Sequence, residues 1–254
     1  MSRIRFSTKD GIGRITLAAP AARNAVDIGW CEDFAEAAKA CATDASLRVV
    51  LIEAEGDFFS VGGDIDHFIA HRNDLTPHVR RMAALFHEGL LSLHNGRLPV
   101  VSAVQGLAAG GGFSLALQAD LILAAQSARF CSAYSSSGLS PDGGLTYTLP
   151  RMLGTRRAFE IMALNPVLDA ETAQRLGIVA RVFADDVFRA EVEACIARLA
   201  GMSAGALAAL KKLLAASLDN NMEQQLAMEA ESVAQLAGSE DTQAILEAFL
   251  ARRR

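Results

Sequence analysis

Short apolar runs alternate with longer amphipathic stretches through most of the chain. Residues 48–53, 100–104 and 120–124 are rich in aliphatic and β-branched side chains, and they predict buried strands. Residues 27–43 and 76–95 carry apolar positions at helical spacing, and Asp27 is placed to cap the first of these helices. Strands that alternate with helices predict an α/β fold.

The same pattern predicts the remaining elements. Residues 3–8 and 12–18 flank Asp10-Gly11 with alternating polarity, which predicts a β-hairpin. Farther along we expect a short strand, an irregular polar segment, three short helices and a strand, at residues 128–131, 132–144, 145–152, 155–164, 169–176 and 178–183. After residue 190 the sequence is rich in Ala, Leu and Glu and has no strand signal. We therefore expect a core over residues 1–190 and a helical lid or oligomer-forming region over residues 191–254.

Composition narrows the class of protein. The 254 residues are 51% hydrophobic, which suffices for one large core, and the net charge is −5. There is no long basic block, so we expect no nucleic-acid partner. No apolar run reaches the roughly 20 residues that span a bilayer, so we expect no membrane partner. The four scattered cysteines match no metal or redox spacing, and with no apolar signal region they predict free thiols in a reducing cytoplasm.

Glycines gather after two of the predicted strands. Gly110, Gly111 and Gly112 precede a buried helix, where each glycine costs roughly 1 kcal/mol relative to alanine. A tight turn would explain them, and so would free N–H groups that face a ligand. Gly62 and Gly63 follow another buried strand. One N–H from each turn could meet at a single oxygen, which is how an oxyanion hole stabilises an acyl carbonyl that becomes an enolate.

Other chemistries fit the sequence less well. The glycine spacing matches neither a dinucleotide fingerprint nor a P-loop, and Gly112–Ala116 is one residue short of a nucleophile elbow. All five histidines precede the glycine triple, which disfavours a serine hydrolase. His67 and His71 have the spacing of a metal pair on a helix, but we expect exposed surface histidines and no metal site. His87 and His94 lie seven residues apart on one predicted helix, and we expect them to serve packing.

Four segments together resemble the enoyl-CoA hydratase/isomerase family, also called the crotonase family. They occur in the family's order and spacing, and the likeness covers nearly the whole chain. The segments are Arg23–Val26 (RNAV), Phe58–Ile65 (FFSVGGDI), Gln105–Gly112 (QGLAAGGG) and Gly138–Gly144 (GLSPDGG), the last followed by Leu149–Arg151 (LPR).

The resemblance implies a fold, a substrate and a set of site residues. The fold would be the ClpP/crotonase spiral of repeated ββα units, with a helical carboxyl-terminal region that forms trimers or hexamers. The substrate would be an acyl-CoA, with coenzyme A as part of the substrate and no separate cofactor. Gly63 and Gly111 would supply the oxyanion N–H groups. The CoA pocket would be lined by Arg23, Ala25, Val26, Ser60, Gly62, Asp64 and Ile65, and further substrate contacts would come from Gly110, Ser114, Tyr134 and Leu139.

The sequence departs from the hydratase pattern at two positions. Hydratases of this family use two glutamates to add water to an enoyl double bond, and Ser114 and Tyr134 stand at those positions here. Neither residue replaces a carboxylate near neutral pH, since serine ionises far higher and tyrosine titrates at about 10. We therefore expect the chain to lack the paired carboxylates that activate water.

One carboxylate, Asp142, stands in the Gly138–Gly144 segment. A double-bond shift needs a single acid/base, and isomerase branches of the family, among them Δ3,Δ2-enoyl-CoA isomerases and ring-epoxide isomerases, place Asp or Glu here. We expect an enoyl-CoA isomerase in which Leu139, Leu145 and Tyr134 shield Asp142. Alternatives are a hydratase or another crotonase-type lyase, a turn or helix-cap role for Asp142, and outside the enzyme class a catalytically weak acyl-CoA-binding protein.

Overall fold

The computed structural model describes residues 2–252, and its centre is a six-stranded sheet with the order β1-β2-β3-β4-β6-β9. The antiparallel hairpin β1 (Ile4–Lys9) and β2 (Ile12–Leu17) forms one edge, as predicted. The remaining neighbours are parallel: β3 (Val49–Ala54), β4 (Val100–Val104), β6 (Leu121–Ala125) and β9 (Arg181–Phe183). The predicted strands at 48–53, 100–104 and 120–124 are thus confirmed within one residue.

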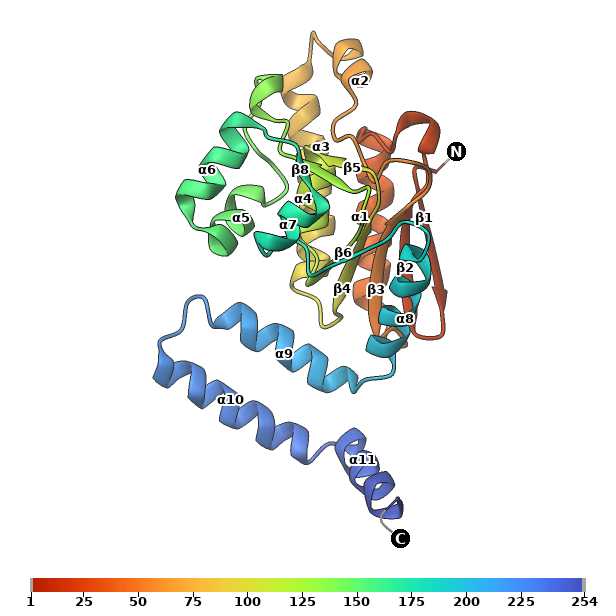
Figure 1. Ribbon diagram of the computed structural model, residues 1–254, viewed down its shortest axis with the longest axis vertical. Helices are drawn as coiled ribbons and strands as arrows, with labels where there is room; N and C mark the ends of the chain where they lie inside the picture. Colours follow the sequence, from red (N-terminus) through yellow and green to blue (C-terminus); the bar gives the residue numbers. More distant parts are fainter. Residues whose placement is uncertain (1, 253–254) are drawn as a thin grey trace.

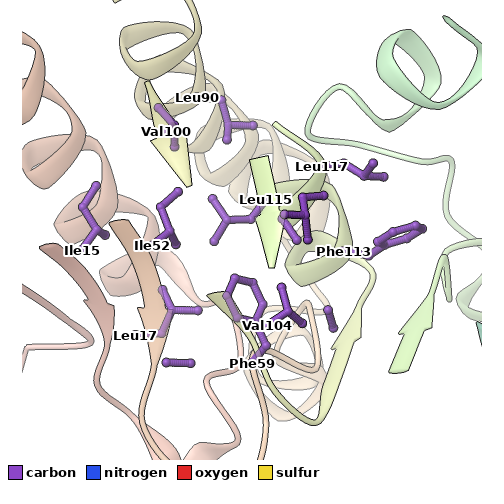
Figure 2. Packing of buried hydrophobic residues seen from close by; sticks show 14 of the residues in the cluster. Ile15, Leu17, Ile52, Phe59, Leu90, Val100, Val104, Phe113, Leu115 and Leu117 are labelled. Carbon is purple, nitrogen blue, oxygen red and sulfur yellow. The ribbon is translucent and has the colours of Figure 1, made fainter. Parts of the chain in front are cut away.

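Helices cover both faces of this sheet, so its strands are apolar on both sides. Val50 and Ile52 of β3 belong to the main core, which α1 (Ile28–Thr43) and α3 (Leu75–His94) cover. Val49 and Leu51 point to the other face and pack with α8 (Phe188–Ala200). Figure 2 shows Ile15, Leu17 and Ile52 directed into the same interior as Phe59, Val104 and Leu115. The period-two alternation of a strand therefore divides each run between two cores.

An aromatic cluster joins α1 to α3. Asp27 caps α1 by accepting a hydrogen bond from Trp30 N, as predicted. Trp30 stacks on Phe34 at 5.1 Å between ring centroids and meets Phe86 of α3 edge-on at 5.6 Å. Such ring pairs contribute about 0.5–1.5 kcal/mol each beyond area burial. The cluster fixes the register of α3, and with it the side chains that α3 presents to the site described below.

A smaller sheet lies beside the first, with the order β5-β7-β8. It comprises β5 (Leu107–Ala109), β7 (Arg129–Cys131) and β8 (Leu168–Asp169), followed in sequence by α7 (Ala170–Arg175). The loop between β7 and β8 carries α5 (Leu145–Leu153) and α6 (Thr155–Leu164), and α4 (Gly111–Leu117) follows β5. The short helices and the irregular segment after residue 131 match the prediction, apart from the 3₁₀ turn Ser135–Ser137.

Several short elements were not predicted, among them the 3₁₀ turn Pro20–Ala22 and strand β8, and one strand is shorter than predicted. α2 (Ile65–Ala70) was missed because none of its residues is buried, so it carries no core-facing stripe. β5 was missed because its three residues lie inside what reads as one glycine turn. The predicted strand at 178–183 pairs only over Arg181–Phe183.

Asn24 is buried and has a positive φ. Its side-chain amide donates hydrogen bonds of 3.0 and 2.9 Å to Glu55 O and Phe58 O, which hold the 19–24 turn in place.

The helices α9 (Ala204–Ala216), α10 (Met222–Ala237) and α11 (Glu240–Ala251) extend away from the rest of the chain (Figure 1). None of them has a buried residue, whereas α8 packs into the core, so the core extends through Ala200. Lys211 anchors α9: its ammonium group donates to Leu93 O, Leu98 O and Asp120 Oδ2 at 2.8–3.1 Å. Residues 1, 253 and 254, at the ends of the two predicted regions, lie outside the described residues.

The described helices include none that alone is long and apolar enough to cross a bilayer. Taken as one segment, the sharply bent pair α8 and α9 would be long and apolar enough, by length and composition only.

Candidate active site

The two glycine turns lie side by side. Ser60 and Ala108 form a parallel bridge, in which Ser60 N donates to Leu107 O at 3.1 Å and Ala109 N donates to Ser60 O at 2.9 Å. These bonds join the chain that leaves β3 to β5, just ahead of Gly110. The first glycine turn is therefore held directly against the second, as the oxyanion-hole hypothesis requires.

Only glycine fits at the point of closest approach. Gly62 has a φ of +83°, a left-handed conformation that L-residues rarely adopt. A Cβ added there would lie 2.7 Å from Ala109 O and 3.2 Å from Gly111 N. The contact between the turns is thus made backbone to backbone, and the peptide groups on either side can face one common point.

Two N–H groups at this contact have no acceptor among the described residues. Gly63 bridges to Val26, but the bonds of that bridge use Val26 N and Asp64 N and leave Gly63 N unpaired. Gly111 is the first residue of α4, whose first intrahelical bond runs from Ser114 N to Gly110 O. Helix-terminal N–H groups carry partial positive charge. Both groups are available to stabilise an oxyanion.

A cavity of about 450 Å³ opens over these glycines. Several predicted site residues line it: Val26, Gly63, Ile65, Gly110, Gly111, Tyr134, Leu139 and Asp142. An apolar part of its wall comes from Phe68 of α2 and from Val79, Met82, Ala83 and Phe86 of α3. The cavity therefore joins an apolar chamber to a polar floor, which suits an acyl group attached to a carbonyl.

Other predicted site residues lie beside the cavity without lining it. Ser60 is fully buried, and its hydroxyl donates to Asn24 O at 2.7 Å and accepts from Gly62 N at 3.2 Å. Ala25 is buried, Arg23 is exposed, and the Asp64 carboxylate caps α2 by accepting from His67 N at 3.0 Å. These residues shape the 23–26 and 60–64 segments; their contact with CoA stays a prediction.

Asp142 presents its carboxylate at the cavity wall. Its Oδ1 accepts hydrogen bonds from Gly143 N and from His87 Nε2 of α3. No hydrogen bond reaches Oδ2 from the described residues, so this oxygen is available to a ligand. The side chain is 35% exposed, so the expected shielding is incomplete in the single chain. Leu139 and Tyr134 line the cavity, whereas Leu145 is fully buried in the core and does not line it, so the shielding of Asp142 by these three residues stays a prediction.

His87 was taken for a packing residue, and the structure shows that this was wrong. Its side chain is 45% exposed and contacts Asp142 across 55 positions of sequence. No sequence signal marks His87, because only the structure shows that Ala83, one helical turn earlier on α3, lines the cavity.

Ser114 and Tyr134 form a hydrogen-bonded pair beneath Asp142. Their hydroxyl oxygens are 3.0 Å apart, and Ser114 Oγ donates to Asp142 O at 2.7 Å. Tyr134 also points at Asp142 O, at 3.4 Å. Burial raises the pKa of the Tyr134 phenol above its ordinary value; the hydrogen bond with Ser114 opposes this rise, and the nearby Asp142 charge adds to it. Both hydroxyls are neutral donors that hold the backbone of Asp142.

Cys31 lines the cavity and has to be weighed as a nucleophile. Burial raises the pKa of its thiol to about 12, and the charges of Asp27, Asp142 and Glu32 act in the same direction. A thiol that stays protonated near neutral pH is a poor nucleophile. Cys31 is therefore not a candidate nucleophile near neutral pH.

Two facing glycine turns with unpaired N–H groups beneath a largely apolar cavity suit an enzyme that binds an acyl carbonyl. The chain belongs to the enoyl-CoA hydratase/isomerase family, whose profile matches residues 7–254. It therefore has the crotonase fold, and it is an acyl-CoA enzyme of that family.

Some relatives of this chain are named as hydratases and others as isomerases. A probable enoyl-CoA hydratase of Rhodobacter capsulatus is 35% identical over 98% of this chain and 95% of its own length. The 1,2-epoxyphenylacetyl-CoA isomerase of Escherichia coli K12 is 30% identical over 100% of this chain and 97% of its own. The crystal structure of an enoyl-CoA hydratase from Polaromonas sp. JS666 superposes with a TM-score of 0.91 at 30% identity, covering 98% of this chain and 97% of that one.

Proposed function

We propose that this enzyme is an enoyl-CoA isomerase in which Asp142 is the acid/base. The observation that carries the proposal is the set of ionisable groups at the cavity. Asp142 is the only carboxylate among the described residues that line it. The two positions at which hydratases carry glutamates hold Ser114 and Tyr134, and their hydroxyls are engaged with each other and with Asp142 O.

The proposed reaction moves one proton. Asp142 Oδ2 takes a proton from C2 of a 3-enoyl thioester, and the electron pair spreads over the C2–C4 system and the thioester oxygen. Gly63 N–H and Gly111 N–H donate to that oxygen while it carries the negative charge. Asp142 then returns the proton to C4, which leaves a 2-enoyl thioester. The apolar wall formed by Phe68, Met82 and Phe86 receives the acyl chain.

A comparison of two reactions tests this proposal. Purified enzyme is incubated in deuterated water with a 3-enoyl-CoA and, separately, with crotonyl-CoA. We expect conversion to the 2-enoyl isomer with deuterium exchange at C2 or C4, together with much slower hydration of crotonyl-CoA. Hydration at an ordinary enzymatic rate would instead support a hydratase. Acyl-CoA binding without any exchange would support a binding protein.

We also propose that α9, α10 and α11 join copies of the chain into a trimer or a hexamer. Large apolar side chains on these helices are more than half exposed, among them Leu210, Leu214, Leu226, Val233 and Ile245. None of the described residues 191–252 lines the cavity of its own chain, so a lid role there stays a prediction. Sedimentation equilibrium is expected to give three or six chains, and a monomer at micromolar concentration would contradict the proposal.

The proposed proton transfer uses no cofactor beyond the coenzyme A of the substrate. We further propose a cytoplasmic location, which the four free cysteines support because free thiols suit a reducing compartment.

A further inference from the structure

Three histidines meet where α2 and α3 join, outside the proposed active site. His67 and His71 lie one turn apart on α2, and His78 lies in the first turn of α3. The short connection between the helices folds back, with Asp74 N donating to His71 O at 3.0 Å. The three imidazoles lie partly buried at the surface, packed against one another. We call His67, His71 and His78 the histidine cluster.

The nitrogen atoms of the cluster converge. One ring nitrogen from each of the three residues lies within 4.8 Å of the other two. His67 Nε2 and His78 Nε2 are 2.7 Å apart, and the rings of His71 and His78 stack with centroids 3.9 Å apart. An ion bound at the ordinary 2.0–2.1 Å by nitrogens in tetrahedral geometry would hold them about 3.3 Å from one another. To bind one ion, His67 Nε2 and His78 Nε2 would move apart, and any pair near the 4.8 Å limit would move closer.

The surroundings already orient one of the ligands. His71 Nδ1 donates to His67 O at 2.9 Å, which leaves His71 Nε2 as the free lone pair. Metal-bound histidines commonly have their second nitrogen fixed in this way by a carbonyl or carboxylate.

We propose that the histidine cluster binds one divalent transition-metal ion of the zinc class, with water as the fourth ligand, and that the ion clips α2 to α3. Three imidazoles suit zinc, nickel or copper, whereas magnesium and calcium take oxygen ligands. The ion would add a tertiary link to α2, which has no buried residue of its own to anchor it.

The consequence reaches the cavity through Phe68. This residue lies on α2 between two ligands of the proposed site, and it lines the cavity. Its ring is packed on Gly63, where an added Cβ would lie 2.9 Å from Phe68 Cζ. Val79, next to His78, lines the cavity from α3. The ion therefore fixes the wall that covers one of the two oxyanion donors.

The experiment uses full-length protein without a histidine tag, stripped of metal with a chelator and titrated with Zn²⁺ by calorimetry. We expect one zinc ion per chain and no binding of Mg²⁺. Co²⁺ should give the visible absorption of a tetrahedral nitrogen site. Amide hydrogen exchange in residues 64–79 should slow when zinc is bound.

Single-residue variants test whether zinc binds at the histidine cluster or elsewhere on the chain. His71→Gln and His78→Gln should each weaken zinc binding at least tenfold. The matched control is His94→Gln, at the exposed far end of α3, which should bind zinc like the wild type. If zinc does not bind the wild type, or binds the cluster variants equally well, the site is wrong. If zinc binds but exchange in residues 64–79 does not change, the clip is wrong. Should a cluster variant fail to fold, the wild-type zinc, magnesium and exchange measurements decide by themselves.

Discussion

Asp142→Asn is expected to lower kcat for 3-enoyl-CoA isomerisation by about 10²–10⁴-fold, the usual contribution of a positioned acid/base. Asparagine has the shape of aspartate, and its amide oxygen can still accept the hydrogen bond from Gly143 N. It cannot take up a proton from C2. Acyl-CoA binding should stay nearly intact, because the oxyanion donors and the apolar wall are untouched. The measurement is the rate of 2-enoyl thioester formation, beside the Kd of a non-reacting acyl-CoA.

His87→Gln is the informative companion variant. It keeps the Asp142 carboxylate but replaces the imidazole that bonds to Oδ1. Because His87 acts through Asp142, we expect a smaller loss of kcat together with a change in the pH profile, and little change in KM. A wild-type rate in Asp142→Asn would remove Asp142 from the mechanism, whatever the result with His87.

Gly111→Pro is expected to lower kcat by about 10²–10³-fold, the cost of removing one oxyanion donor. Gly111 is the first residue of α4, a position that proline tolerates well because its N–H has no intrahelical partner. The substitution thus deletes the N–H with little damage to the helix. Steady-state kinetics should show the loss mainly in kcat, while circular dichroism and thermal unfolding should remain close to wild type.

Gly111→Ala is the matched control, since alanine keeps the N–H. A Cβ at this position would lie 3.7 Å from Val26 Cγ2, an ordinary contact, and φ at Gly111 is not positive. We therefore expect kcat within a few-fold of wild type. If the proline and alanine variants isomerise equally fast, Gly111 N–H does not stabilise the transition state.

The sheet could be predicted because its strands are apolar on both faces. Val49–Ala54 is an almost unbroken apolar run, and the structure divides it between two cores. α2 could not be predicted in this way, because Ile65 and Phe68 face the cavity and Ile69 faces solvent. Its apolar residues serve the site rather than the core, so they show no pattern that the fold dictates.

The candidate site could be predicted where backbone geometry demands particular residues. Gly62 is required by a left-handed φ and by a carbonyl in the way of any Cβ, and such positions show in a sequence as glycines. His87 is different, because many residues could occupy that turn of α3, and only the folded chain brings it to Asp142. The histidine cluster was hidden for a similar reason: His67 and His71 have recognisable spacing, but His78 reaches them only because the chain reverses between α2 and α3.

The direction in which the carboxyl-terminal helices leave the core is set by one charged side chain, that of Lys211. The Lys211 side chain is only 11% exposed, and the three hydrogen bonds of its ammonium group form a tripod. Two of these hydrogen bonds go to Leu93 O, at the end of α3, and to Leu98 O, before β4. The third goes to the Asp120 carboxylate, which also accepts from Val100 N at 2.8 Å. A tripod fixes orientation as well as distance. In the proposed assembly, the angle at which copies of this chain meet would therefore be set within each chain by the contacts of Lys211.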